Sequence, residues 1–124
     1  GNLANYYAGV CFLKTGDNES AIDYLSDSSS DDEVISSVAY GSMGDAYMNT
    51  GEFDNAINYW TKAAFNSKND FTTPIYLKRA AMALEEDGNL DRALEYYTII
   101  QKEYSNSDEA RDIDKFITRA QLKQ

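Results

Sequence analysis

Histidine is absent from the 124-residue chain, and cysteine, proline and tryptophan occur once each. Without histidine the chain lacks the commonest general base, the commonest metal ligand and every Ser-His or Cys-His pair. Its single cysteine, Cys11, allows no disulfide within the chain. Cys11 lies at helical spacing from Ala8 and Phe12, which predicts a small buried side chain rather than a reactive thiol. No catalytic residue, metal site or cofactor is therefore expected.

Positive charge is also scarce. Eleven Lys and Arg stand against 21 Asp and Glu, and Lys14 is the only cation among residues 1–60, opposite ten acids. Such a surface repels phosphate, so neither nucleic acid nor anionic lipid is an expected partner. The acidity indicates a solvated face first, and it leaves open the attraction of a basic partner.

No apolar run approaches the roughly 18 residues that a membrane helix needs, and no signal peptide is visible. Direct membrane insertion by this segment is therefore not expected. The chain begins Gly1-Asn2 instead of with Met. Gly1 resembles a residue left by tag cleavage, so we expect a piece of a longer protein. An N-terminal anchor or further repeats could precede it.

The chain does contain an internal repeat. The stretches TGDNESAIDYL, TGEFDNAINYW and DGNLDRALEYY share Gly, four residues, Ala, an aliphatic residue, an acid or amide, and Tyr. Gly16, Gly51 and Gly88 lie 35 and 37 residues apart (51 − 16 and 88 − 51). Self-similarity at such a period indicates stacked structural repeats.

Apolar residues recur at intervals of three and four along nearly the whole chain, which predicts helices. No stretch alternates apolar and polar residues as a strand does. Ser30, Asp31 and Asp32 are predicted N-caps, and Thr73-Pro74 is predicted to open a later helix. The expected fold is an all-α solenoid in one domain, 1–124. It has three helix-turn-helix repeats, about 2–30, 34–67 and 71–104, and a capping helix at about 107–122.

This pattern resembles the tetratricopeptide repeat, whose unit is normally 34 residues. The second repeat carries the match at Tyr40, Met43, Gly44, Tyr47, Gly51, Phe53, Ala56, Trp60 and Ala63. The resemblance implies that small residues lie where the helices of a pair cross: Gly9, Gly44, Ala81, Ala21, Ala56 and Ala93. The proline that ends each unit in the family is missing here.

Residues 76–120 also resemble a group of bacterial envelope proteins with an N-terminal membrane anchor and a periplasmic repeat domain, similar to the ancillary subunit of the secretion translocon. This resemblance implies a periplasmic domain anchored through a missing N-terminal segment. The last helix resembles a capping helix with a charged outer face, made by Arg111, Asp112, Asp114, Lys115, Arg119 and Lys123.

The tetratricopeptide resemblance implies that the first helix of each pair lines a concave groove that binds a partner. The groove positions carried over are Tyr6, Val10, Leu13, Asp45, Met48, Asn49, Lys78 and Met82. A groove that clamps a peptide carboxylate uses Lys and Asn, and only Lys78 could serve here. The apolar strip instead suits an amphipathic helix or extended segment with basic flanks. Coverage by the protein's own missing part, or by a second copy in a homodimer, stays open.

The sequence therefore predicts a non-catalytic protein-protein interaction scaffold, in a bacterial envelope assembly or secretion complex. The alternative is a structural spacer or self-association domain without a separate ligand. The acidic run Glu85-Glu86-Asp87 lacks the ligand spacing of a calcium loop, and it is interpreted as a solvated helix end.

Overall fold

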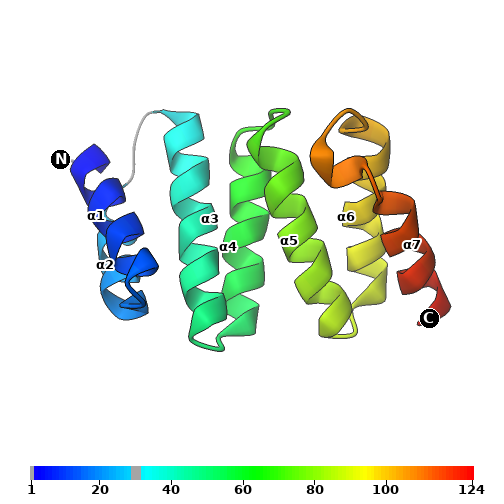
Figure 1. The fold of residues 1–124 in the computed structure, drawn as a ribbon, viewed down its shortest axis with the longest axis horizontal. Helices are drawn as coiled ribbons and strands as arrows, with labels where there is room; N and C mark the ends of the chain where they lie inside the picture. The colour runs from blue at the N-terminus through cyan, green and yellow to red at the C-terminus, as the bar shows by residue number, and fades with distance from the viewer. Residues whose placement is uncertain (1, 29–31) are drawn as a thin grey trace.

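The chain folds into a single row of antiparallel helices, with its termini at opposite ends (Figure 1). The computed structural model describes residues 2–28 and 32–124, and this part contains no strand. The expected all-α helical repeat fold is confirmed. The helices are α1 (Asn2–Lys14), α2 (Asn18–Ser26), α3 (Glu33–Asn49), α4 (Phe53–Asn66), α5 (Thr72–Glu86), α6 (Leu90–Glu103), the 3-10 helix η1 (Asp108–Ala110) and α7 (Ile113–Leu122).

The same turn joins the two helices of each pair. Gly16, Gly51 and Gly88 have φ of 86°, 81° and 83°, a conformation that costs glycine little and other residues much. The N–H after each glycine donates back to the helix at 2.9 Å, which closes a Schellman motif. The period of the sequence is therefore the period of these three turns. The bonds are Asp17 N to Phe12 O, Glu52 N to Tyr47 O, and Asn89 N to Leu84 O.

Asp32 begins α3 as predicted. Its Oδ1 accepts the N–H groups of Val34 at 2.9 Å and Ile35 at 3.1 Å, which satisfies two donors at the helix start. The other two predicted caps, Ser30 and Asp31, lie outside the described residues.

The predicted start of α5 at Thr73-Pro74 is wrong, because the helix already begins at Thr72. The Asn69 side chain accepts the N–H groups of Phe71 at 2.9 Å and Thr72 at 2.8 Å, and so supplies the cap. Pro74 falls within the first turn, where the backbone N–H has no partner inside the helix, so the proline is still tolerated.

Small residues occupy the helix crossings, as the repeat pattern predicts. A β-carbon on Gly9 would lie 2.6 Å from Leu25 Cγ, and one on Gly44 would overlap the indole ring of Trp60. Four alanines at the remaining crossings have no exposed surface: Ala21, Ala56, Ala81 and Ala93. These positions set how closely the helices approach.

Gly44→Ala is expected to destabilise the protein even though alanine favours helices. Helix propensity alone would give a gain of about 1 kcal/mol. Overlap with the buried Trp60 ring should cost about 1–3 kcal/mol, so the net change is an expected loss. Urea unfolding of Gly44→Ala beside Ser42→Ala, on the same helix, measures the difference. A stability equal to or above that of Ser42→Ala would contradict the close packing.

The core continues from one end of the row to the other. One buried cluster lies within α2 and α3 and a second extends from α4 to α7, with Tyr40 and Tyr47 packed against both. Trp60 is buried, whereas Tyr47 is only partly buried and stacks on Tyr59. Such a core is built by stacking neighbours, as in repeat proteins.

The prediction that Cys11 is buried is wrong. Its side chain is exposed, and so are Leu3 at 48% and Tyr7 at 60%, which precede it at four-residue steps. This side of α1 lies at the end of the row, where no described helix packs on it (Figure 1). The helical spacing predicts the helix itself correctly, but a terminal helix has neighbours on one side only.

Candidate functional site

The first helices of successive pairs lie next to one another along one side of the row (Figure 1). Helix α1 contacts α3, α3 contacts α5, and α5 contacts η1. Over the described residues, the second helices α2, α4 and α6 approach each other less. The side on which helices crowd together is the inner side of a curved row, so α1, α3 and α5 carry the candidate groove.

Asp45 on α3 is bound by the protein itself. Arg79 Nη1 lies 3.0 and 3.1 Å from its two oxygens, and Trp60 Nε1 donates to Oδ1 at 3.0 Å. Burial raises the pKa of Asp45, and Arg79 and Trp60 act in the opposite direction. This predicted groove residue therefore links α3, α4 and α5.

Lys78 on α5 is engaged in the same way. Its Nζ lies 3.1 Å from Asp112 Oδ1 and 3.3 Å from the carbonyl oxygen of Glu109, and 4.5 Å from the ring centre of Phe116. The hydrogen bond from Lys78 lowers the pKa of Asp112. Lys78, the one candidate for a carboxylate clamp, thus holds the segment that follows α6.

Glu85 lies at the centre of a polar cluster, and its interpretation as a solvated helix end is wrong. It is 5% exposed and accepts four hydrogen bonds. The donors are Tyr97 Oη at 2.8 Å, Arg119 Nε at 2.8 Å, Arg119 Nη2 at 2.7 Å and Lys123 Nζ at 2.6 Å. Arg119 is the main cause that lowers the pKa of Glu85 to about 2, against the effect of burial. Two cations assigned to the outer face of the cap therefore turn inward.

Three of the four ion pairs that link helices in the described part of the chain share one spacing, and the fourth, between Glu85 and Lys123, spans 38 residues. Asp45 and Arg79, Lys78 and Asp112, and Glu85 and Arg119 are each 34 residues apart in the chain. That is the length of one tetratricopeptide unit. The segment from η1 to α7 consequently takes the place of the first helix of a fourth pair. Opposite charges at a separation of 34 are the sequence signal that would have revealed these pairs.

The remaining groove residues are not engaged to the same degree. Tyr6 and Leu13 pack against the N-terminal core cluster and Met48 against the C-terminal one, all partly buried. Val10 is also partly buried. Met82, at 42% exposed, is the most accessible apolar side chain of the set.

Two further contacts within the protein occupy parts of the candidate groove. The ring of Tyr76 fills the space over Gly41, where it is buried, and burial raises its pKa to about 12. Asn49 donates to Asn18 Oδ1 at 3.1 Å at the bottom of α3. The two charged residues of the predicted groove set, Asp45 and Lys78, are thus paired within the protein, and Met82 is its most exposed apolar side chain.

Among residues 2–28 and 32–124, no three acidic, cysteine or histidine side chains cluster in a way that could hold a metal ion. None of the helices described there combines the length and apolar character that a bilayer crossing requires.

Comparison with known families agrees with this geometry. The model of a domain of unknown function, DUF6340, matches residues 42–122, which is more than half of the chain. The chain belongs to the DUF6340 family. A tetratricopeptide repeat model matches residues 3–27 of this DUF6340 protein, the first helix pair. No curated protein matches the chain.

The two matches together span almost the whole row of helices. The tetratricopeptide match covers α1 and α2, and the DUF6340 match begins within α3 and contains all three 34-residue ion pairs. The DUF6340 protein is thus a tetratricopeptide repeat protein, a fold that typically acts as a protein-protein interaction scaffold.

Proposed function

We propose that this DUF6340 protein is a non-catalytic scaffold that binds a peptide or amphipathic helix of a partner protein along α1, α3 and α5. The proposal rests on Met82, which is 42% exposed, and on the partly exposed Met48 and Val10 on the neighbouring helices α3 and α1; we call these three residues the methionine strip. Methionine suits such a surface because its flexible, polarisable side chain adapts to different partners.

Exposed acids at the turns between helices favour a partner with basic flanks. Glu52, just after the turn at Gly51, and Glu86, just before the turn at Gly88, are exposed. Asp45 and Glu85 are instead neutralised by ion pairs within the protein. Because Lys78 is also paired, no free cation of the predicted groove set remains to bind a carboxylate. A basic amphipathic segment fits this surface better than an acidic chain terminus.

The proposal predicts that Met48→Lys combined with Met82→Lys abolishes capture of the partner, because two charges would be buried in the apolar contact. The experiment is a crosslinking pull-down from the source cell with full-length protein. The control with the same added charge is Asn55→Lys with Asn58→Lys, two exposed positions on α4. Circular dichroism verifies that both variants stay helical. Capture that survives the methionine changes would contradict the groove.

A structural role is the second candidate, favoured by the exposed face of Leu3, Tyr7 and Cys11 at the end of the row. Self-association through this face predicts a dimer whose population rises with concentration in light scattering, and its loss in Tyr7→Lys. A pull-down that recovers only copies of the same protein would favour this role over the groove.

A further inference from the structure

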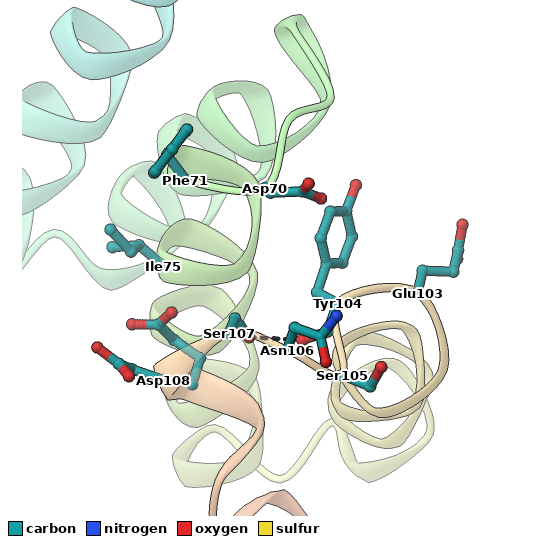
Figure 2. A pocket seen from close by; sticks show the side chains of 10 residues that line it. Asp70, Phe71, Ile75, Glu103, Tyr104, Ser105, Asn106, Ser107 and Asp108 are labelled. Atoms are coloured by element: carbon teal, nitrogen blue, oxygen red, sulfur yellow. Dashed lines mark hydrogen bonds between the residues drawn. The ribbon is translucent and has the colours of Figure 1, made fainter.

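A second concave surface lies outside the methionine strip. It is a pocket of about 430 Å³ between the start of α5 and the segment that joins α6 to η1. Figure 2 shows its lining, with Phe71 and Ile75 on one side and Tyr104 on the other. The volume falls within the range of ligand pockets.

Phe71, Ile75 and Tyr104 form the apolar part of the pocket lining, which we call its floor, and the Phe71 ring is accessible. Phe71 is 83% exposed, although the other aromatic side chain of the pocket, Tyr104, is partly buried. Ile75, one turn after Phe71, is also partly exposed. An exposed aromatic ring beside a hollow offers contact area that the isolated protein does not use.

Four carboxylates surround this floor, and none of the lining residues is a cation. In Figure 2, Asp70 lies between Phe71 and Tyr104, and Asp108 lies on the side of Ile75. Glu103 and Glu109 complete the set. Asp108 pairs with Arg111 at 3.0 Å, but both side chains are at least 80% exposed, and such pairs contribute little.

Two N–H groups at the adjacent helix start already have an acceptor within the protein. The N–H of Phe71, just before α5, and the N–H of Thr72, its first residue, donate to Asn69 Oδ1. The C-terminal end of α6, which adds partial negative charge, leads directly into Tyr104. Shape and charge together therefore select a cationic group with an apolar stem.

We propose that this pocket binds an arginine side chain of a partner protein. The guanidinium stacks on Phe71 and pairs with Asp70 and Asp108, and a neighbouring aliphatic residue of the partner contacts Ile75. Arginine fits better than lysine because its planar group combines ring stacking with two-pronged carboxylate pairing. The inference rests on the proposed scaffold function only in that the ligand is a protein segment.

The test is a ¹⁵N–¹H NMR titration of the protein with the peptide acetyl-Leu-Arg-Leu-Arg-amide. The comparison peptide carries citrulline, the uncharged analogue, in place of arginine. We expect amide shifts confined to 69–76 and 103–111, and binding about tenfold weaker for the citrulline peptide, since two exposed ion pairs are lost. Equal binding of both peptides, or shifts centred elsewhere, would overturn the proposal.

Variants separate the pocket from general acidity and from exposed apolar positions elsewhere. Asp70→Asn with Asp108→Asn should weaken the arginine peptide about tenfold, and Phe71→Ala about threefold. Asp23→Asn with Asp54→Asn removes the same charge at exposed positions on α2 and α4 and should have little effect. Leu122→Gln, at an exposed apolar position near the C-terminus that lines neither surface, should leave peptide binding unchanged. Equal weakening by both charge variants would overturn the pocket while leaving the groove proposal, tested by the pull-down, intact.

Discussion

Glu85→Ala is expected to lower the free energy of unfolding by about 3 kcal/mol and to loosen α7. Removing one member of a buried ion pair typically costs 3–5 kcal/mol. The lower end applies here because Arg119 and Lys123 are half-exposed and can be hydrated again. The hydroxyl of Tyr97 is buried, so water cannot replace the acceptor that it loses.

Urea unfolding measures the stability, and hydrogen exchange of amides 113–122 reports whether α7 opens. Glu86→Ala is the matched control, because this neighbouring acid is exposed. Glu85→Ala should accelerate exchange in α7 and Glu86→Ala should not. Two variants that behave alike would contradict the role assigned to Glu85.

The same cluster predicts a dependence of stability on pH. The pKa of Glu85 falls from 4.5 to about 2 on folding, so its ion pairs stabilise the protein above pH 4.5. That contribution, about 3 kcal/mol, should disappear as the pH drops from 4.5 to 2. Denaturant midpoints across this range should fall more steeply for the native protein than for Glu85→Gln. Parallel curves would show that another group dominates acid unfolding.

Trp60→Ala is expected to cost about 4 kcal/mol, the largest loss for a single side chain of the core. The indole is 6% exposed and lies against Gly44, and its N–H donates to Gly41 O at 3.2 Å and to Asp45. Its removal leaves a cavity between α3, α4 and α5 and takes one partner from the partly buried carboxylate of Asp45.

Trp60→Phe separates packing from hydrogen bonding. Phenylalanine retains much of the apolar contact but donates no hydrogen bond, so we expect a loss of about 1–2 kcal/mol. Thermal unfolding of both variants beside Phe53→Ala, an exposed aromatic on α4, provides the scale. A Trp60→Ala variant no less stable than Phe53→Ala would contradict the central position of this ring.

The local features of the fold were predictable from the sequence because their causes are local. A glycine after each first helix provides the left-handed residue of the turn, as Gly16, Gly51 and Gly88 do. Small residues at one step of the repeat mark the crossings, as at Gly9 and Gly44. Both signals are visible within a few residues.

The environment of Glu85 and Cys11 was not predictable in this way. The partners of Glu85 lie 34 and 38 residues further along, so an isolated acidic run looks solvated. The exposure of Cys11 depends on which side of α1 has a neighbour. Lys78 illustrates the same limit for the groove, since its pairing with Asp112 requires the stacking register of α5 and η1.

The most direct test of the proposed binding side is residue-specific photocrosslinking in the source cell. A benzoylphenylalanine replaces Met82 on α5 in one full-length variant and Asn58 on α4 in the other. Our account predicts an adduct with a different protein from position 82 and none from position 58. Adducts of that protein only from position 58, or adducts from position 82 only with copies of the same chain, would contradict it.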